Sequence, residues 1–278
     1  MPDGLPGYSE VMLWYTDMAA VVQQKIASQD WAEILPGRSI EVTSRPKTID
    51  TLRQKLVRDH NTPLPNIQDV AGVRFEAEMS LDEQDLVVSK IVDLFDHDPA
   101  TSIHDLRENP HSGYRAVHIW LRFDGSVEQL HGPVEVQVRT HLQGQWANMY
   151  ESAADLLGRG IRYEEMPEDP AIARSVEALK SISIDQIVEL ESVLNRIAQV
   201  RSEIATSHER LTAANAELAS QQTTEERRSS VRESLDTAAI NLVTIKGLEE
   251  QARSMAVDLQ TRLRALRDTF QQQRTRMR

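Results

Sequence analysis

Val134-Glu135-Val136-Gln137-Val138-Arg139 is the stretch that decides the fold of this chain. Valines alternate with polar residues, and side chains along a β-strand point alternately to opposite faces, so one face of this strand is apolar and the other is polar. Glu135, Gln137 and Arg139 then lie in line on the polar face. Such groups on a central strand are costly unless they are paired or bind a ligand. The pattern therefore predicts a strand with an ion-pair network or a functional site.

The segments around this strand show helix and strand patterns in turn. We expect helices over residues 10–28, 48–58, 81–95 and 141–157, and strands over 39–43, 70–76, 100–106, 116–123 and 134–139. Because regular βαβ repeats are missing from this order, it predicts an α+β domain with a mixed β-sheet flanked by helices.

The two halves of the chain differ in composition. Residues 1–170 hold all 11 Pro and 10 of the 11 Gly, and they carry 15 Lys and Arg against 28 Asp and Glu, a net charge of −13. Residues 171–278 carry 16 basic against 15 acidic residues, or +1. A segment free of Pro and poor in aromatic residues is typical of long helices. We therefore expect a globular domain over residues 1–165 and a helical domain over residues 170–278.

Heptad spacing in the second half predicts a coiled coil. Apolar residues follow a 4–3 alternation from Leu190 to Leu218 and again from Val231 to Phe270. The polar residues 221–228 separate the two seams, and Thr224 is a candidate N-cap for the second helix. The seams are similar in length, so we expect a long antiparallel coiled-coil hairpin. Self-packing or homo-oligomerisation through this hairpin is the simplest role.

Composition excludes several classes of protein. The 278 residues contain no cysteine, which rules out disulfide scaffolds and cysteine nucleophiles and fits the cytoplasm. The first residues lack a basic region and carry acids and prolines, so no signal peptide is expected. No apolar run approaches the roughly 20 residues of a membrane helix, so no membrane association is expected.

Cations gather at the start of an expected helix. Ser44-Arg45-Pro46-Lys47 leads from a strand into a helix that carries Arg53, Lys55 and Arg58. Such a cluster can bind a polyanion, for example the triphosphate of a nucleotide. A solvated basic helix face is the alternative.

Two carboxylates belong to neighbouring strands. Asp69 stands directly before the strand that contains Arg74, and Glu135 lies on the strand over residues 134–139. Carboxylates that converge from adjacent strands can bind Mg²⁺, as phosphoryl-transfer sites do. Ion pairs within the fold are the alternative.

A turn precedes the strand over residues 116–123. Residues 109–113 deliver Tyr114 to the start of this strand, and His118 follows four residues later on the same face. An exposed tyrosine beside a basic cluster is a candidate platform for stacking a base. Each of these residues, taken singly, also has an ordinary structural explanation.

In order, these motifs resemble the synthetase domain of the RelA/SpoT family, the alarmone synthetases. The motifs are Arg45-Pro-Lys47, Lys55, Asp69-Val-Ala-Gly-Val-Arg74, Ser112-Gly-Tyr114-Arg-Ala-Val-His118 and Glu135-Val-Gln137-Val-Arg139-Thr140. The resemblance covers about residues 10–160 and implies a nucleotidyltransferase-like fold. It also implies a stand-alone small alarmone synthetase with an added coiled-coil tail.

The resemblance further implies a (p)ppGpp synthetase, an ATP:GTP/GDP 3′-diphosphotransferase that uses Mg²⁺. The β,γ-pyrophosphate of ATP moves to the ribose 3′-hydroxyl of GDP or GTP, and AMP is released. By the same resemblance the catalytic and metal-binding residues are Asp69 and Glu135, and the ATP-binding residues are Arg45, Lys47, Lys55 and Arg74. The residues for the acceptor nucleotide are Tyr114, which stacks on the base, and His118, Gln137 and Arg139.

One motif departs from the family pattern. Many members have a lysine and an asparagine before the Gly-Tyr, whereas Pro110-His111-Ser112 forms an apparently shorter turn here. A phosphate-binding cation is then absent unless His111, Arg107 or Arg115 replaces it.

Two alternatives to (p)ppGpp synthesis remain, and the first follows from this departure. One is a toxic relative that pyrophosphorylates adenine nucleotides or the 3′ end of tRNA. The other is an inactive scaffold that acts through its coiled coil. The retained Asp69 and Glu135 argue against the scaffold, and the charge of −13 in residues 1–170 argues against a broad nucleic-acid surface.

Overall fold

The strand that contains Glu135 is one of five in a single sheet of the first unit. The computed structural model describes residues 7–44, 47, 49–58, 63, 66–125, 130–163, 165–218 and 225–276. The chain divides into two units, residues 1–168 and 169–278, and each is described by itself. In the first unit the strands are β1 (Ile40–Ser44), β2 (Ala71–Ala77), β3 (Ile103–Asp105), β4 (Val117–Asp124) and β5 (His131–Thr140). The helices are α1 (Tyr8–Ala27), α2 (Ile49–Arg58), α3 (Leu81–Leu94), α4 (Pro99–Ser102) and α5 (His141–Leu157), with 3₁₀ turns at His111–Gly113 and Arg159–Tyr163.

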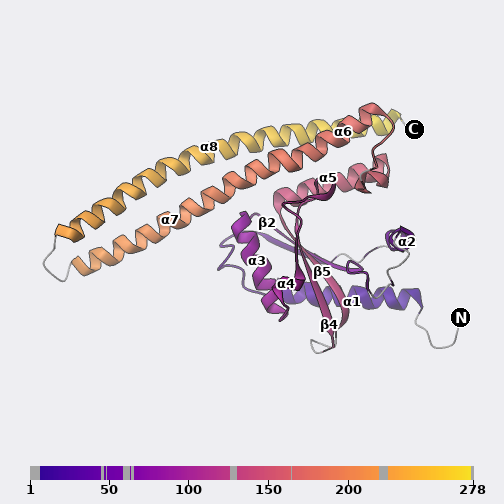
Figure 1. Cartoon of the computed structure of the whole chain (residues 1–278), viewed down its shortest axis with the longest axis horizontal. Helices are drawn as coiled ribbons and strands as arrows, with labels where there is room; N and C mark the ends of the chain where they lie inside the picture. Colours follow the sequence, from indigo (N-terminus) through magenta and orange to yellow (C-terminus); the bar gives the residue numbers. More distant parts are fainter. Residues whose placement is uncertain are drawn as a thin grey trace. The chain divides into compact units, whose positions relative to one another are not determined.

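The sheet is mixed, as the sequence predicts. The strand order is β1-β2-β5-β4-β3, in which β2 and β5 are parallel and the other neighbouring pairs are antiparallel. The central position of β5 is visible in Figure 1, between β2 and β4. The expected α+β class and the flanking helices are therefore confirmed.

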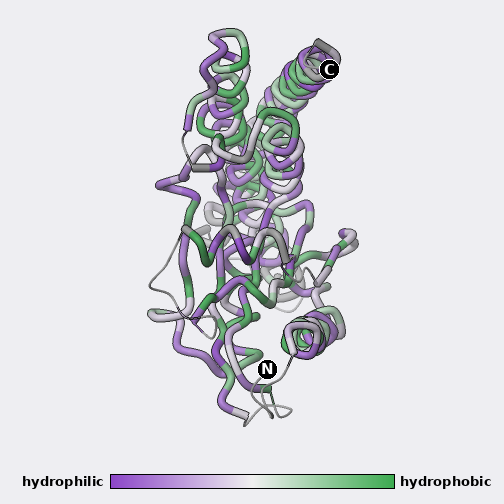
Figure 2. The backbone as a smooth tube through the Cα atoms, turned by 90° about the vertical axis from the view of Figure 1, so that its right-hand side faces the viewer, coloured by the Kyte–Doolittle hydropathy of each residue, from purple (hydrophilic) through white to green (hydrophobic). Residues whose placement is uncertain are grey.

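Helices α1 and α3 cover the apolar face of the sheet. Val134, Val136 and Val138 of β5 are fully buried and belong to one core cluster with residues of both helices. Helix α1 buries Tyr15, Met18, Ala19, Val22 and Ile26, the spacing of a single helical face. Hydrophobic and hydrophilic residues change places every few positions along the backbone (Figure 2). The opposite face of β5 is therefore left for its polar residues.

The strand expected over residues 100–106 is shorter than predicted. Asp98 accepts a hydrogen bond from the amide of Ala100, and Pro99 occupies the first helical turn, so residues 99–102 form α4 and only residues 103–105 form β3. An acidic N-cap followed by proline is a strong signal for a helix start. This local signal outweighs the strand propensity of the segment.

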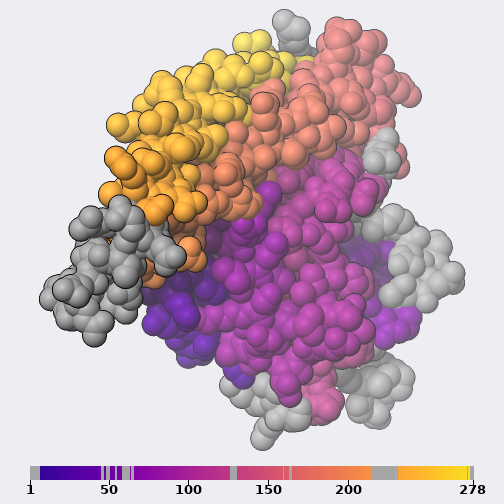
Figure 3. All heavy atoms as spheres, turned by 60° about the vertical axis from the view of Figure 1, so that its left-hand side comes forward, coloured from indigo at the N-terminus to yellow at the C-terminus, as the bar shows by residue number. Residues whose placement is uncertain are grey.

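The second unit is a helical hairpin. It consists of α6 (Pro170–Ser181), a π-helical turn (Ile182–Ile187), α7 (Val188–Leu218) and α8 (Glu225–Arg276). Helices α7 and α8 lie side by side and run in opposite directions (Figure 1), and their visible atoms are in contact along the hairpin (Figure 3). Arg201 on α7 pairs with Glu249 on α8 at 2.8 Å. The expected antiparallel hairpin is confirmed, while the expected N-cap Thr224 lies outside the described residues.

The heptad seam predicted for α8 is wrong at two positions of its first half, while Val231, Ala238 and Ile245 of that half are partly buried. Leu235 and Leu242 are 54% and 53% exposed, although the spacing places them in the seam. Asn241 faces α7 instead, since its amide donates a hydrogen bond to Glu203 at 3.4 Å. This polar pair leaves Leu235, Leu242 and the 74% exposed Val243 as an apolar stripe on the outer face of α8.

None of the helices that the structure describes combines the length and the apolar character that crossing a bilayer requires.

Candidate active site

Strand pairing brings the predicted site residues together on the polar face of the sheet. Gln137 on β5 lies opposite Arg74 on β2 and opposite His118 on β4. Glu135 is likewise the partner of Gly72 on β2 and Trp120 on β4. Because cross-strand partners share a face, one polar surface spans the three central strands.

Glu135 is part of a closed hydrogen-bonded cycle, called here the Glu135 network. His118 Nδ1 lies 3.1 Å from Glu135 Oε1, and the Tyr114 hydroxyl lies 2.9 Å from His118 Nε2. Arg139 Nη2 donates to the Tyr114 hydroxyl at 2.8 Å and to Gln137 Oε1 at 2.5 Å. Gln137 Nε2 closes the cycle by donating to Glu135 Oε2 at 2.6 Å. Four residues named from the sequence as acceptor-binding thus surround one named as catalytic.

Arginine constrains the bond directions in the network. Arg139 can only donate, so the Tyr114 hydroxyl accepts from it, and the hydroxyl is also hydrogen-bonded to His118 Nε2. His118 carries a proton on Nδ1 and donates to Glu135. Every bond in the cycle is therefore satisfied when Glu135 is ionised.

The pKa of Glu135 is consistent with this arrangement. Burial opposes ionisation, but the hydrogen bond and charge of His118 outweigh it, and the pKa of Glu135 is held below its ordinary value. The negative charge of Asp69 acts in the other direction and raises the pKa of Glu135. The two carboxylates are therefore close enough to repel, and a cation between them would relieve that repulsion.

Tyr114 is less exposed than the sequence suggested. Its side chain is partly buried, the Arg139 guanidinium carbon lies 5.0 Å from the ring centroid, and His118 packs edge-on at 5.6 Å. Burial raises the pKa of the Tyr114 hydroxyl, which keeps it protonated as a donor. The expectation of an exposed stacking platform is corrected, because the hydroxyl is held inside the Glu135 network and Arg139 packs against the ring.

Asp69 lies directly before β2 and binds two lysines. Its carboxylate pairs with the Nζ of Lys47, which follows β1, and with the Nζ of Lys55 on α2 at 2.6 Å. Burial opposes ionisation of Asp69, but both ammonium groups outweigh it, so the pKa of this carboxyl is lowered. The backbone amide of Lys47 donates to the carbonyl of Val70 at 3.0 Å and ties the segment to β2. Arg45, also expected to bind phosphate, lies outside the described residues.

The residues present fit a magnesium ion. The described part of the chain holds no group of three or more His, Asp or Glu placed as metal ligands. Mg²⁺ is commonly bound by one or two carboxylates together with substrate phosphates, which Asp69 and Glu135 match. Both carboxylates have lowered pKa values and are ionised at neutral pH, as metal ligands must be.

Helix α5 closes one end of the polar face. Arg74 lies 3.6 Å from Glu151 of α5, and Arg139 Nη1 lies 3.5 Å from Glu76 of β2. Gly144 permits a close approach, since a Cβ at this position would lie 2.6 Å from Glu76 Oε2. Position 144 therefore admits only glycine unless the Glu76 side chain moves.

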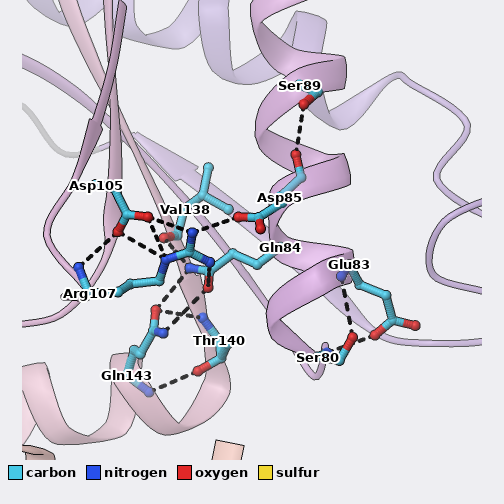
Figure 4. A network of polar contacts seen from close by, with 10 residues as sticks. All are labelled: Ser80, Glu83, Gln84, Asp85, Ser89, Asp105, Arg107, Val138, Thr140 and Gln143. Atoms are coloured by element: carbon cyan, nitrogen blue, oxygen red, sulfur yellow. Dashed lines mark hydrogen bonds and ion pairs between the residues drawn. The ribbon is translucent and has the colours of Figure 1, made fainter. Parts of the chain in front are cut away.

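A second network around Arg107 was not found from the sequence. Figure 4 shows the Arg107 guanidinium between Asp85 on α3 and Asp105 on β3, with 2.6 Å to each carboxylate. Arg107 also donates to Gln84 Oε1 at 3.2 Å, and Gln84, which is fully buried, donates to the carbonyl of Val138 at 3.0 Å. These bonds tie α3, β3 and β5 together at the start of the loop that leads to Tyr114. The signal in the sequence was Gln84, a polar residue among the apolar positions of α3.

The Arg107 network also bears on the cation missing from the turn. Arg107 is committed to two carboxylates, and Arg115 is only 4% exposed and donates from Nε to the carbonyl of Arg107 at 3.2 Å. Both arginines therefore hold the loop in place. Ser112 in the turn has φ of +56° and Gly113 has φ of +86°, so the backbone turns sharply into Tyr114. Of the three candidate replacements, only His111 has an exposed side chain.

The lowered pKa of Glu135 predicts a pH-dependent contribution to stability. A depressed folded-state pKa stabilises the protein above the unfolded value, near 4.5 for Glu, and this stabilisation is lost as pH falls through the folded value. Glu135→Gln should therefore lower the free energy of unfolding by about 1–3 kcal/mol at about pH 6, because the amide cannot accept from both donors.

Urea unfolding of the wild-type and variant chains without metal, followed from about pH 6 down to about pH 3, measures this difference. The difference in the free energy of unfolding between the two chains should become steadily smaller as the pH falls. The exposed Glu41→Gln serves as control and should show no such trend. A difference for Glu135→Gln that stays constant or grows on acidification contradicts the lowered pKa.

Comparison with known proteins places this geometry in a class. The model of the family described as "Region found in RelA / SpoT proteins" matches residues 44–155. Over 170 residues the chain is 49% identical to Uncharacterized protein Rv1366 of Mycobacterium tuberculosis and to Uncharacterized protein Mb1401 of Mycobacterium bovis. The match covers 61% of this chain and 58% of each relative, so the chain spans somewhat more than half their length.

Solved structures share the fold. Small alarmone synthetase 1 from Bacillus subtilis matches with a TM-score of 0.51 and 21% identity over 72% of this chain and 98% of that chain. Small alarmone synthetase 2 from the same organism matches with a TM-score of 0.51 and 20% identity over 69% of this chain and 98% of that chain. The first unit thus has the fold of the small alarmone synthetases. Residues 44–155 match the RelA/SpoT family model, in agreement with the resemblance seen in the motifs.

Proposed function

We propose that this chain is a (p)ppGpp synthetase, which transfers the β,γ-pyrophosphate of ATP to the ribose 3′-hydroxyl of GDP or GTP and releases AMP. The observation that carries the proposal is one hydrogen-bonded network of five residues, Glu135, His118, Tyr114, Arg139 and Gln137. Its Glu135 is within electrostatic reach of the lysine-bound Asp69. The RelA/SpoT region over residues 44–155 supports the same reaction. Both substrates are cytoplasmic nucleotides, so we place the protein in the cytoplasm.

The donor side of the reaction belongs to Lys47, Lys55 and Asp69. The two ammonium groups lie where they could exchange Asp69 for the phosphates of ATP, with Arg45 and Arg74 as further ligands. Mg²⁺, held by Asp69 and Glu135, would neutralise charge on the polyphosphate as phosphorus is attacked. The lysines supply further positive charge in a partly buried setting, where electrostatic stabilisation is strong.

The acceptor side belongs to the Glu135 network. The 3′-oxygen forms a bond to the β-phosphorus of ATP, and the bond from that phosphorus to the bridging oxygen of AMP breaks. The hydroxyl proton passes to Glu135, which is ionised at neutral pH, and then to solvent. Gln137 and His118 hold the carboxylate in one orientation, so little reorganisation is needed when the hydroxyl arrives.

The acceptor can be identified by thin-layer chromatography of the products. The purified chain is incubated with radiolabelled ATP, Mg²⁺ and, in separate reactions, GDP, GTP, AMP or tRNA. AMP together with a guanosine 3′-diphosphate product supports the proposal. Product formed only with an adenine nucleotide or tRNA selects the toxic relative. If no labelled AMP is formed from ATP in any reaction, the inactive scaffold is selected.

We further propose that the hairpin assembles the protein into homo-oligomers. Leu235, Leu242 and Val243 follow helical i, i+7, i+8 spacing on the exposed face of α8, and a second hairpin could bury them. Light scattering after size exclusion should give an oligomer for the full chain. The double variant Leu235→Glu/Leu242→Glu and a chain that ends at Glu168 should both be monomeric.

The control for this prediction is Thr237→Glu, an exposed position on another flank of α8. It should leave the oligomer intact. If the chain that ends at Glu168 remains oligomeric, the first unit has an interface of its own. If all variants and the wild-type chain are monomeric, the stripe does not mediate self-association.

A further inference from the structure

An exposed aromatic residue lies on the polar face of the sheet beside the catalytic candidate. Trp120 of β4 is 41% exposed, and it is the cross-strand partner of Glu135. His118, which binds Glu135, lies two residues earlier on the same strand and so on the same face. Exposing an indole costs free energy that burial against a partner would recover. Trp120 takes no part in the hydrogen bonds of the Glu135 network or in the ion pairs of Asp69.

The indole is backed by an imidazole. The ring centroids of Trp120 and His104 are 3.6 Å apart with an interplanar angle of 33°. His104 lies on β3 and is itself the cross-strand partner of His118. Its Nε2 atom is buried and makes no hydrogen bond to the residues that the structure describes, so His104 acts here through its ring face. Because His104 covers one face of the indole, the exposed area of Trp120 belongs to its edges and its other face.

Charged and aromatic groups are separated across the polar surface. The cations lie on the β2 side of Glu135: Lys47 and Lys55 are paired with Asp69, and Arg74 lies on β2 itself. Trp120 and His104 lie on the opposite side, on β4 and β3. A nucleotide has the same division, with an anionic phosphate end and a flat base. Tyr114 is the other aromatic candidate, but Arg139 and His118 already pack against its ring.

We propose that Trp120, supported from behind by His104, stacks on the nucleobase of a substrate nucleotide. This inference rests on the proposed function and adds to it a base-binding residue on the β4 side of Glu135. An indole face can stack on any base, so either the adenine of ATP or the base of the acceptor could occupy this position. Separate titrations with an ATP analogue and with GDP distinguish the two.

Isothermal titration calorimetry measures binding without turnover. Wild-type, Trp120→Ala and Trp120→Phe chains are titrated with a non-hydrolysable ATP analogue, with GDP and with inorganic tripolyphosphate, which has no base. Trp120→Ala should raise the Kd for one of the two nucleotides by about 5- to 150-fold, the range expected for the loss of one base stack. Tripolyphosphate binding should not change, and Trp120→Phe should keep most of the affinity. Weaker binding of the ATP analogue assigns the base to the donor, and weaker binding of GDP assigns it to the acceptor.

Trp14→Ala is the matched control. Trp14 is 42% exposed, almost the same as Trp120, but it lies on α1, which packs against the apolar face of the sheet. This variant should bind both nucleotides like the wild-type chain. Fluorescence gives a second readout, since nucleotide should quench the wild-type emission more than that of Trp120→Phe, which binds but lacks the indole.

Failure of this inference can be distinguished from failure of the proposed function. If Trp120→Ala binds each nucleotide with the same affinity as the wild-type chain, the stacking role is wrong and the synthetase proposal stands. Equal weakening of tripolyphosphate and nucleotides also overturns the stacking role, because the effect is then not on the base. If the wild-type chain binds no nucleotide, both proposals fail.

Discussion

Asp69→Asn and Glu135→Gln are each expected to lower kcat by at least about a thousandfold while the chain stays folded. Both substitutions keep the shape of the side chain and remove its charge. Asp69 would lose its attraction for Lys47 and Lys55, and Glu135 would no longer accept from both His118 and Gln137. The metal site and the acceptor for the hydroxyl proton are then lost together. The measurement is AMP release at saturating Mg²⁺, with far-ultraviolet circular dichroism to verify folding.

Asp17→Asn is the matched control for this prediction. Asp17 lies exposed on α1, away from the polar face of the sheet, and its loss of charge should leave kcat unchanged. If either Asp69→Asn or Glu135→Gln keeps most of its activity, the role assigned to that carboxylate is wrong. A fall in kcat that excess Mg²⁺ restores would limit the role of the residue to metal affinity.

Tyr114→Phe is expected to lower kcat/KM for the acceptor by about 10- to 100-fold, more than a pure stacking residue would. The hydroxyl accepts from Arg139 and is hydrogen-bonded to His118 Nε2, so its removal breaks the Glu135 network at two adjacent bonds. Each buried group left without a partner costs about 1–3 kcal/mol. KM for ATP should change little, because Lys47 and Lys55 do not contact Tyr114 through any bond of the network. Initial rates with each substrate varied in turn measure both constants.

Tyr114→Ala extends this test. Loss of both the ring and the hydroxyl should raise the acceptor KM further, and Tyr8→Phe, at an exposed position on α1, should behave like the wild-type chain. A Tyr114→Phe chain with normal kinetics would show that only the ring face matters, as the sequence motif alone suggested. Equal changes in both KM values would mark Tyr114 as a packing residue.

Alternation and motif order were sufficient to predict the central part of the fold. Val134 to Arg139 determined a strand with one apolar and one polar face, and the structure has this strand in the middle of a mixed sheet. Asp98-Pro99 was the local signal missed when residues 100–106 were assigned to a strand. Whether a residue belongs to a strand or a helix depends largely on residues close to it in the sequence, and therefore most elements could be predicted.

The Glu135 network could not be predicted in the same way. Its bonds depend on the register that sets His118 opposite Gln137, and register is a property of strand pairing rather than of either segment. The Arg107 network joins Asp85 and Asp105 across the fold for the same reason. On α8, heptad spacing placed Leu242 in the seam, whereas in the structure Leu242 is 53% exposed and its neighbour Asn241 is hydrogen-bonded to Glu203 of α7.

The pairing of Asp69 with two lysines has a consequence for substrate affinity. Lys47 and Lys55 cannot serve the carboxylate and a polyphosphate at once, so ATP must compete with an internal anion for its own counter-ions. A divalent cation that takes the place of the lysines at Asp69 frees them for ATP, and by thermodynamic linkage ATP strengthens cation binding by the same factor. Binding of ATP and of the metal is thus coupled through an exchange of ion pairs. Without the metal, a polyphosphate must compete with the Asp69 carboxylate for the two lysines.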